Sequence, residues 1–587
     1  MDIKQKKLNQ NTTRRTKLLT FILALCAIGA SAQTSRDMGN GTFRNPVIWS
    51  DVPDVCVCRV DDTFYMVSTT MHMSPGCTIM KSKDLVNWSV AGYAHDQLEE
   101  IDEFALKNGK NDYSKGSWAA NIRYDKYEKR FYLIVTCNTT QKSYIFTTTD
   151  IEHGPWHRNE VSMCYDPGFL FEDTGTECKK YVVHPNGSLQ QYQAYICEII
   201  SDGKGGVKLG ERKEMLSYAQ ADNPIQGLRA EGYHGYKIGD YYYIFMIQGG
   251  KGDAWRQQIC WRSKALFGEP WEVKKVFVGN MRNEDGSVFQ KSGGVAQGNI
   301  FDTPDGKWYA MLFQDQGAVG RMPVLIPLKW GTDGWPVFGN NGESVDVLQE
   351  MPVKGVGDRT ASIVVSDEFN NGKESDRYYP SDTYANSLGK GGEYDLTTSI
   401  LKKEWQWNHN PDNRYWTLTE RKGWLRLKGG ILANNIREAR NTLTQRMWGP
   451  KCSATTLLDT RGMKEGDCAG LTIFQNRYGY VGVEFIDGKT HIVMRRANDK
   501  GDATGEIKEK VLLKGTKVYL RAQADFDDRH DKAFYEYSLD GKKWQKIGDE
   551  HVLYFDWPDF CGNRFGLFYF PTKTLGGNAD FDFFHVK

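Results

Sequence analysis

Carboxylic acids recur at corresponding points in the N-terminal part of this chain. Asp54, Asp166 and Glu231 each stand shortly before a tyrosine that opens an apolar run. If the fold brings them into one pocket, their charges repel, so one acid stays protonated while another is ionised. A protonated acid can give its proton to a leaving oxygen, and a carboxylate can activate water. These are the steps of glycoside hydrolysis. A surface or turn-capping role is the alternative for any one of them.

A repeat of roughly 60 residues would bring these acids together. Its markers are five tyrosines that begin apolar runs: Tyr65, Tyr132, Tyr181, Tyr243 and Tyr309. A unit of this length holds about four short strands, and radial repetition of four-stranded sheets is a β-propeller. We therefore expect an all-β fold with a five-bladed propeller over residues 38–350. A β-sandwich with chance similarity between segments is the alternative.

The strand before each tyrosine should line the axis of such a propeller. At that place the units supply Asp54, Trp118, Asp166, Glu231 and Gln297, one from each unit. Rotational symmetry places equivalent positions around one axis. The sequence therefore predicts one pocket that holds all five side chains.

The same segments carry a resemblance to a known family. Taken in chain order, residues 45–54, 82–88, 118–119, 165–167, 230–234 and 333–336 resemble the motifs of glycoside hydrolase family 43. The resemblance covers about residues 40–350. It implies a five-bladed propeller and hydrolysis with inversion at the anomeric carbon.

The resemblance also implies roles for individual residues. Asp54 matches the general base, Glu231 the general acid, and Asp166 the acid that tunes the pKa and orients its partner. Trp118 matches a wall of the sugar pocket. The remaining expected substrate contacts are His234, Gln297 and Arg321. The family often has histidine where Gln297 stands, which leaves open whether an ion occupies the axis.

A second region follows residues 351–365, which we interpret as a linker. Residues 366–587 lack the repeat and contain alternating strands such as 478–486 and 517–524, which favour a two-sheet sandwich of jelly-roll, lectin-like type. This region resembles the concanavalin A-like C-terminal domain of family 43 β-xylosidases. That resemblance implies a domain that narrows the propeller mouth and favours exo cleavage. It also suggests a structural calcium at Asp367 and Asp582, although Asp582 suits a plain edge strand equally well. The chemistry itself requires no cofactor.

The N-terminus predicts export. Basic residues over 4–17 precede an apolar stretch over 18–30 and the small-residue site Ala30-Ser31-Ala32. This pattern indicates a signal peptide over residues 1–32, cleaved near Ala32-Gln33, and a secreted or periplasmic protein without a membrane span after processing. An uncleaved anchor is the alternative.

Composition narrows the partners. The net charge is +1 with 25% charged residues, which gives no reason to expect nucleic acid or an anionic membrane. The twelve cysteines show no metal-binding spacing, so we interpret most as small buried hydrophobic residues.

Three functional hypotheses remain. The leading one is an exo-acting glycosidase that removes β-D-xylosyl or α-L-arabinofuranosyl ends from plant-derived pentose oligosaccharides. An endo-acting arabinanase and a non-catalytic carbohydrate-binding propeller are the alternatives. An invertase-type propeller is disfavoured, because its Asn-Asp-Pro-Asn-Gly motif is absent from the sequence.

Overall fold

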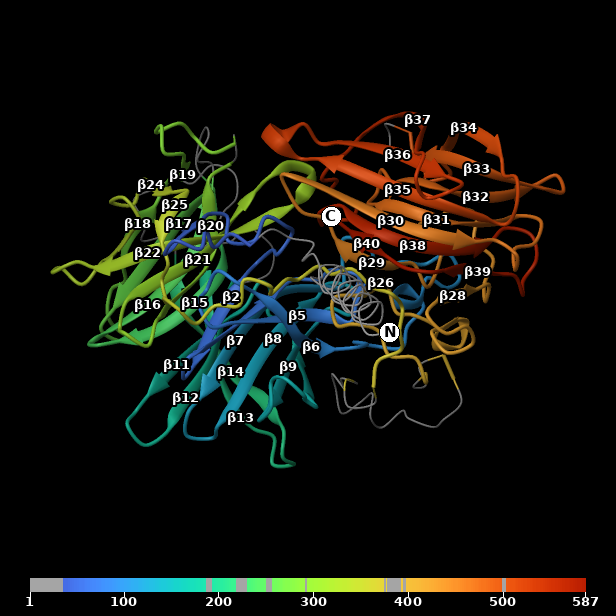
Figure 1. Ribbon diagram of the computed structural model, residues 1–587. Coiled ribbons are helices and arrows are strands. Elements are labelled where there is room, and N and C mark those ends of the chain that lie inside the picture. Colours follow the sequence, from blue (N-terminus) through green and yellow to red (C-terminus); the bar gives the residue numbers. More distant parts are fainter. Residues whose placement is uncertain are drawn as a thin grey trace, which may run out of the picture.

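The computed structural model describes residues 35–185, 193–217, 230–249, 256–290, 293–373, 376, 392–393, 397–498 and 503–587 (Figure 1). In these residues the regular structure is strand with a few short 3-10 turns. No helix among them is long and apolar enough to cross a membrane. The signal peptide expected over residues 1–32 lies outside the described residues.

The N-terminal part of the described chain forms five four-stranded blades around an axis. Blades 1 and 2 contain β2 (Cys56–Val60), β3 (Thr63–Ser68), β5 (Gly76–Ser82), β6 (Ser89–His95), β7 (Ser117–Asp125), β8 (Arg130–Cys137), β9 (Lys142–Thr148) and β10 (His157–Ser162). Blade 3 contains β11 (Gly168–Asp173), β12 (Cys178–Pro185), β13 (Gln193–Ser201) and β14 (Val207–Ser217). Blade 4 contains β15 (Glu231–Ile238), β16 (Tyr241–Gly249), β17 (Arg256–Ser263) and β18 (Glu272–Phe277). Blade 5 contains β20 (Val295–Asp302), β21 (Trp308–Asp315), β22 (Arg321–Trp330) and β23 (Pro336–Phe338).

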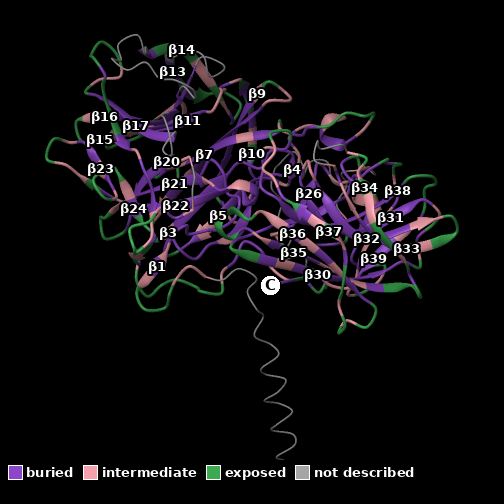
Figure 2. Cartoon of the chain, turned by 90° about the horizontal axis from the view of Figure 1, so that it is seen from above, coloured by how far each residue is buried: buried purple, intermediate pink, exposed green. Residues whose placement is uncertain are grey.

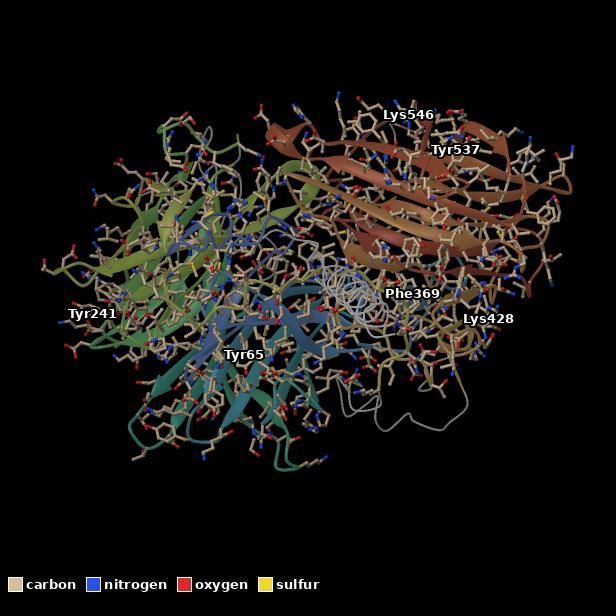
Figure 3. All side chains as sticks on the ribbon, in the orientation of Figure 1. Tyr65, Tyr241, Phe369, Lys428, Tyr537 and Lys546 are labelled. Carbon is tan, nitrogen blue, oxygen red and sulfur yellow. The ribbon has the colours of Figure 1, made fainter. Side chains whose placement is uncertain are left out.

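The repeat in the sequence corresponds to these blades, which confirms the expected propeller. Each marker tyrosine lies in the second strand of its blade, so the strand before it is the innermost one. Figure 3 shows Tyr65 on blade 1 and Tyr241, at the start of β16, on blade 4.

The ring closes where blade 5 meets blade 1. Strand β1 (Thr42–Arg44) pairs antiparallel with β25 (Leu348–Glu350), so the two ends of the propeller segment are joined. Asn299 on β20 accepts a hydrogen bond from Val57 N at 2.7 Å and donates one to Val57 O at 2.8 Å. Blades 3 and 4 touch through a short parallel pairing of β11 with β15. These links hold the innermost strands around the axis.

The C-terminal region is a sandwich of two sheets, as the sequence predicted. One sheet contains β26 (Gln406–Asn408), β29 (Leu443–Arg446), β31 (Asp467–Phe474), β32 (Gly479–Ile486), β33 (Lys489–Arg496), β34 (Glu506–Leu512) and β38 (Arg564–Pro571). The other contains β27 (Trp416–Thr417), β28 (Leu425–Lys428), β30 (Lys451–Asp459), β35 (Lys517–Asp525), β36 (Lys532–Ser538), β37 (Gln545–Val552), β39 (Asn578–Phe581) and β40 (His585–Val586). The first sheet also takes an edge strand from the propeller segment, because β4 (Met73–Ser74) pairs with β26.

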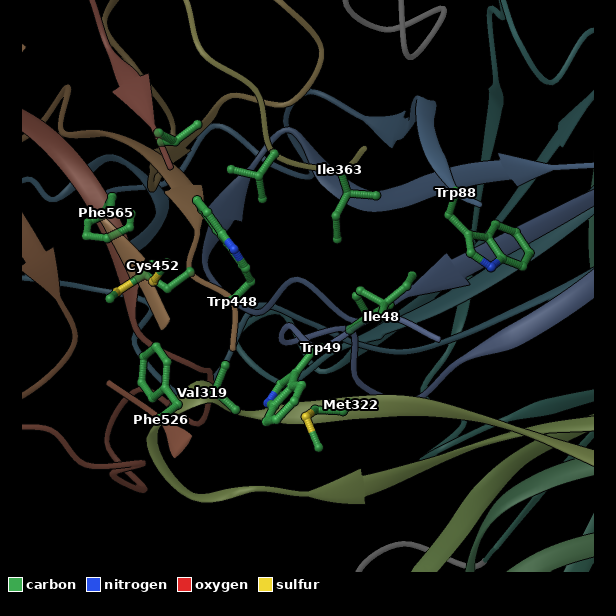
Figure 4. Packing of buried hydrophobic residues seen from close by; sticks show 14 of the residues in the cluster. Ile48, Trp49, Trp88, Val319, Met322, Ile363, Trp448, Cys452, Phe526 and Phe565 are labelled. Atoms are coloured by element: carbon green, nitrogen blue, oxygen red, sulfur yellow. The ribbon is translucent and has the colours of Figure 1, made fainter. Parts of the chain in front are cut away.

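One apolar core runs through both domains. Trp49 and Met322 of the propeller belong to the same buried cluster as Trp448 and Phe526 of the sandwich (Figure 4). Buried residues, purple in Figure 2, continue from one domain into the other. Burying one such large side chain contributes about 1.5–3 kcal/mol, so separating the domains would cost a great deal of free energy.

Polar contacts also cross this interface. Asp51 of the propeller accepts a hydrogen bond from Gly562 N of the sandwich at 2.9 Å, and its backbone carbonyl accepts one from Arg446 Nε at 3.0 Å. Tyr113 of the propeller donates to the Arg437 carbonyl at 2.8 Å. The domains are therefore locked in one relative orientation.

The described cysteines behave as the sequence suggested. All eleven are free thiols, and all but Cys178 are buried. They serve as small apolar side chains.

Candidate active site

In every blade, one residue at or near the start of the innermost strand has a left-handed backbone conformation. It is the pocket residue itself in blades 1, 3 and 5, where Asp54, Asp166 and Gln297 have φ of 51°, 43° and 64°. In blades 2 and 4 it is the next residue, Ala119 (φ 40°) after Trp118 and Gly232 (φ 69°) after Glu231. Non-glycine residues seldom adopt this conformation, so its recurrence at the same place in all five blades is a shared feature of the repeat.

β-bulges accompany this turn of the backbone. The ladders of blades 2, 4 and 5 shift register between Trp118 and Asn121, between Glu231 and His234, and between Ala296 and Gly298. A bulge re-aims a side chain. Gly232 has a second reason to be glycine, since a Cβ there would lie 2.8 Å from Gln297 Cγ.

The re-aimed side chains meet in a cavity of about 560 Å³ at the axis. Six of the sequence-predicted residues line it: Asp54, Trp118, Asp166, Glu231, Gln297 and Arg321. A cavity of this size suits one or two sugar rings.

Asp54 is held by two donors. Arg321 Nη1 lies 3.0 Å from Asp54 Oδ1, and Thr69 Oγ1 donates to Asp54 Oδ2 at 2.7 Å. Thr69 in turn accepts a hydrogen bond from Ala119 N at 2.8 Å. The carboxylate is therefore fixed in orientation beside a permanent positive charge.

Asp166 and Glu231 have the opposite electrostatic character. Burial, followed by the charges of Glu231 and Asp54, raises the pKa of Asp166 well above its usual value. Burial raises the pKa of Glu231 to about 7, with Asp54 adding to the rise and Arg256 opposing it. Gly232 N donates to Asp166 Oδ2 at 2.6 Å, which ties Asp166 to the segment that carries Glu231. Glu231 can thus hold a proton near neutral pH while Asp54 stays beside its cation.

Arg321 has donors to spare. Among the described residues, its Nε and Nη2 atoms are buried and have no hydrogen-bond acceptor. Arg321 itself lines the cavity, so a bound sugar would lie beside its guanidinium group.

The sandwich supplies an aromatic wall that the sequence analysis missed. Phe560 stacks on Trp118 with ring centres 5.1 Å apart and lies 4.7 Å from the Arg321 guanidinium carbon. Trp557 packs against Phe560 at 4.5 Å and is 68% exposed at the cavity rim, and Phe555 also lines the cavity. The aromatic-rich run over residues 554–560 was the available signal, but nothing in it indicated contact with the propeller.

His234 does not line the cavity. It is buried and bonded through Nδ1 to Asn121 Nδ2 at 2.8 Å. Burial, with a smaller effect of Arg123, lowers its pKa well below the usual value, so the ring is neutral. The structure therefore gives His234 a supporting place beside β7 rather than the expected substrate contact.

The residues expected to hold calcium are engaged in other contacts. Asp367 accepts hydrogen bonds from Phe369 N at 3.0 Å and from Trp405 Nε1 at 2.9 Å, one on each carboxylate oxygen. Burial raises the pKa of Asp582 above its usual value, and the charges of Lys517 and Arg421 oppose the rise. Within the described ranges, no group of three or more His, Cys, Asp or Glu residues could hold a metal ion. These contacts do not support a structural calcium at Asp367 and Asp582.

Fold and site together define a carbohydrate-cleaving propeller enzyme, with paired acids in an axial pocket. Residues 43–336 match the family model of glycosyl hydrolases family 43, and residues 393–587 match the β-xylosidase C-terminal concanavalin A-like domain. The chain belongs to glycoside hydrolase family 43 and is a glycosidase.

Individual relatives agree with this assignment. The chain is 31% identical to a β-xylosidase of Formosa agariphila, across 94% of this chain and 92% of that protein. It is 28% identical to a non-reducing end α-L-arabinofuranosidase of Bacteroides ovatus, across 84% and 85%. Among solved structures, a bifunctional GH43-CE protein of Bacteroides eggerthii is 40% identical with a TM-score of 0.79, and the match covers 93% of this chain and 63% of that protein.

The hydroxyl of Thr69 offers a test of how Asp54 is held. Thr69→Val removes the donor to Asp54 and the acceptor for Ala119 N while keeping the shape, so we expect kcat to fall about ten- to a hundredfold, since such a bond to a charged group is worth roughly 1.5–3 kcal/mol. Thr69→Ser is the control and should retain most of the activity. Steady-state kinetics measures both. Equal activity of the two variants would contradict the positioning role.

Proposed function

We propose that this protein is an inverting, exo-acting glycosidase that removes terminal β-D-xylosyl or α-L-arabinofuranosyl residues from plant-derived oligosaccharides. The observation that carries the proposal is the contrast within one cavity: Glu231 with a pKa of about 7, and Asp54 paired with Arg321. An acid that holds its proton and a carboxylate beside a cation are the pair that a single displacement by water requires.

The reaction would proceed in one step. Glu231 donates its proton to the glycosidic oxygen as the bond to the anomeric carbon breaks. Asp54 accepts a proton from a water molecule that attacks the opposite face of the sugar. Asp166, which accepts a hydrogen bond from Gly232 N, helps to orient the segment that carries Glu231. Arg321 orients Asp54 from the wall of the cavity.

The shape of the cavity supports exo action. The propeller axis is covered on one side by Phe555, Trp557 and Phe560 of the sandwich, so the cavity has a wall where an open groove would continue. A terminal sugar can enter such a pocket, with its leaving group directed past the exposed Trp557. The acids all being present weighs against a non-catalytic binding propeller.

The choice between the two pentoses stays open at this site. Both kinds of relative are found among the similar proteins, a β-xylosidase and an α-L-arabinofuranosidase. The two sugars present comparable ring-oxygen and hydroxyl positions, so one pocket can accept either.

The role of the acids can be tested by changing the leaving group. Glu231→Gln should lower kcat/KM on oligosaccharides about a thousandfold, because a sugar leaving group needs its proton, and much less on nitrophenyl pentosides, whose leaving group is acidic. Asp54→Asn should lower activity on both substrates. Asp173→Asn, an exposed carboxylate of blade 3 paired with Lys126, is the matched control and should match the wild type. Full activity of Glu231→Gln on oligosaccharides would refute the assignment.

The products of the wild-type enzyme test inversion and exo action. We expect a β-xyloside to release α-xylose first, or an α-L-arabinofuranoside to release the β-anomer, followed by slow mutarotation. Time-resolved proton NMR measures the anomer, and chromatography measures product length. Initial release of the retained anomer would contradict inversion. Release of a fragment longer than one sugar from the chain end would contradict exo action.

We also propose that the protein is exported. The basic and apolar segments before Ala30-Ser31-Ala32 support this. N-terminal sequencing of the protein recovered outside the cytoplasm should begin at Gln33. A product that keeps residues 1–32 and stays in the inner membrane would favour the anchor instead.

A further inference from the structure

A second ion pair lies in the wall of the cavity, and the reaction steps above do not use it. Arg256 is the first residue of β17 and Asp315 the last residue of β21, so the pair joins blade 4 to blade 5. Arg256 Nε lies 2.6 Å from Asp315 Oδ2. The Arg256 side chain is 9% exposed and that of Asp315 is 32% exposed, and both residues line the cavity.

The position of Arg256 is determined by several contacts. Its backbone N donates to the Gly293 carbonyl at 2.8 Å. Its guanidinium carbon lies 5.2 Å from the ring centre of Phe313, and that of Arg321 lies 5.4 Å from the same ring. Phe313 is fully buried. The ring therefore lies close to both guanidinium groups and helps to hold them at the cavity.

The two arginines serve different acids. Arg321 contacts Asp54 directly. Arg256 forms an ion pair with Asp315 and lines the same cavity as Glu231, on which its charge also acts. We propose that Arg256, held in place by Asp315, is a positioning residue for the general acid, acting on Glu231 by its charge across the cavity. This inference rests on the proposed role of Glu231.

The charges around Glu231 explain the sign of this effect. Asp54 from blade 1 and the burial of the site favour the protonated form of Glu231, while Arg256 and Arg321 favour the ionised form. Of these charged groups, Arg256 has the largest effect on Glu231. Asp166 and Tyr165 of blade 3 also face Glu231, and the charge of Glu231 raises the pKa of each. Arg256 thus limits how far the pKa of Glu231 rises.

Asp315 has the opposite influence through Arg256. A carboxylate bonded to the guanidinium offsets part of its field at other sites. Removing Arg256 should therefore raise the pKa of Glu231, and removing the charge of Asp315 should lower it. A residue pair that only braced two blades would not produce shifts of opposite direction.

The experiment compares pH profiles of kcat/KM on an oligosaccharide that the wild type cleaves. The alkaline limb reports loss of the proton from Glu231 in the free enzyme, so wild-type activity should fall as pH rises through about 7. For Arg256→Gln we expect this limb to move to higher pH by about one pH unit, since an opposite charge nearby commonly lowers a carboxyl pKa by one to three. For Asp315→Asn we expect it to move to lower pH. Arg256→Lys keeps the charge and should leave the limb near that of the wild type.

The outcomes separate the possibilities. Limb shifts in the same direction for Arg256→Gln and Asp315→Asn, or lower activity with unchanged limbs, would overturn the inference and indicate a structural brace. Thermal melting shows whether Arg256→Gln folds. If it does not, the other two variants still test the inference: the alkaline limb should move to lower pH for Asp315→Asn and stay in place for Arg256→Lys. Failure of the proposed function would show separately, as full activity of Glu231→Gln on the same oligosaccharide.

Discussion

The buried ion pair between Arg321 and Asp54 is the interaction on which the rest of the site depends. Removing two charges from water is expensive, and the pair is tolerable only if its geometry is well maintained. Asp51 provides part of that geometry, because its Oδ1 accepts a hydrogen bond from Arg321 N at 2.7 Å. The other oxygen of Asp51 accepts one from Gly562 N of the sandwich. The orientation of Asp54, the proposed base, is therefore coupled to the docking of the second domain.

Through this coupling, the apolar core shared by the two domains helps to position the residues of the pocket. Phe560 of the sandwich covers the Arg321 guanidinium, and Gly320 lies so close to Asp51 that a Cβ would stand 2.2 Å from its Oδ1. A propeller that lacked the sandwich would lose the second partner of Asp51 and the ring over Arg321. The pocket is thus a product of both domains, although its acids all come from one.

The sequence allowed the propeller and its acids to be predicted because both follow from local pattern. The tyrosine repeat locates the second strand of each blade, and symmetry then brings Asp54, Asp166 and Glu231 together. The sandwich strands were likewise visible as alternation, such as β32 and β35. The aromatic wall around Phe560 could not be predicted, because it depends on how the two domains pack. No local sequence pattern encodes which residues of one domain contact the other. The same holds for β4, a propeller segment that joins the sandwich sheet. His234 shows the converse, since it is a motif neighbour of Glu231 that the bulge of β15 turns away from the cavity.

The balance of charges in the pocket explains why it contains Arg256 in addition to Arg321, which pairs with Asp54. Asp54, Asp166 and Glu231 line one cavity, where the charges of Glu231 and Asp54 make ionisation of Asp166 less favourable, and the charge of Asp54 does the same for Glu231. Without compensation, burial would keep Glu231 protonated so firmly that proton transfer to the leaving oxygen would become unfavourable. A single arginine cannot serve both acids, since Arg321 is bonded to Asp54. A second guanidinium on another blade, restrained by its own carboxylate, separates the two roles. In the proposed mechanism, Arg321 orients the base, while Arg256 keeps the acid able to give up its proton near neutral pH.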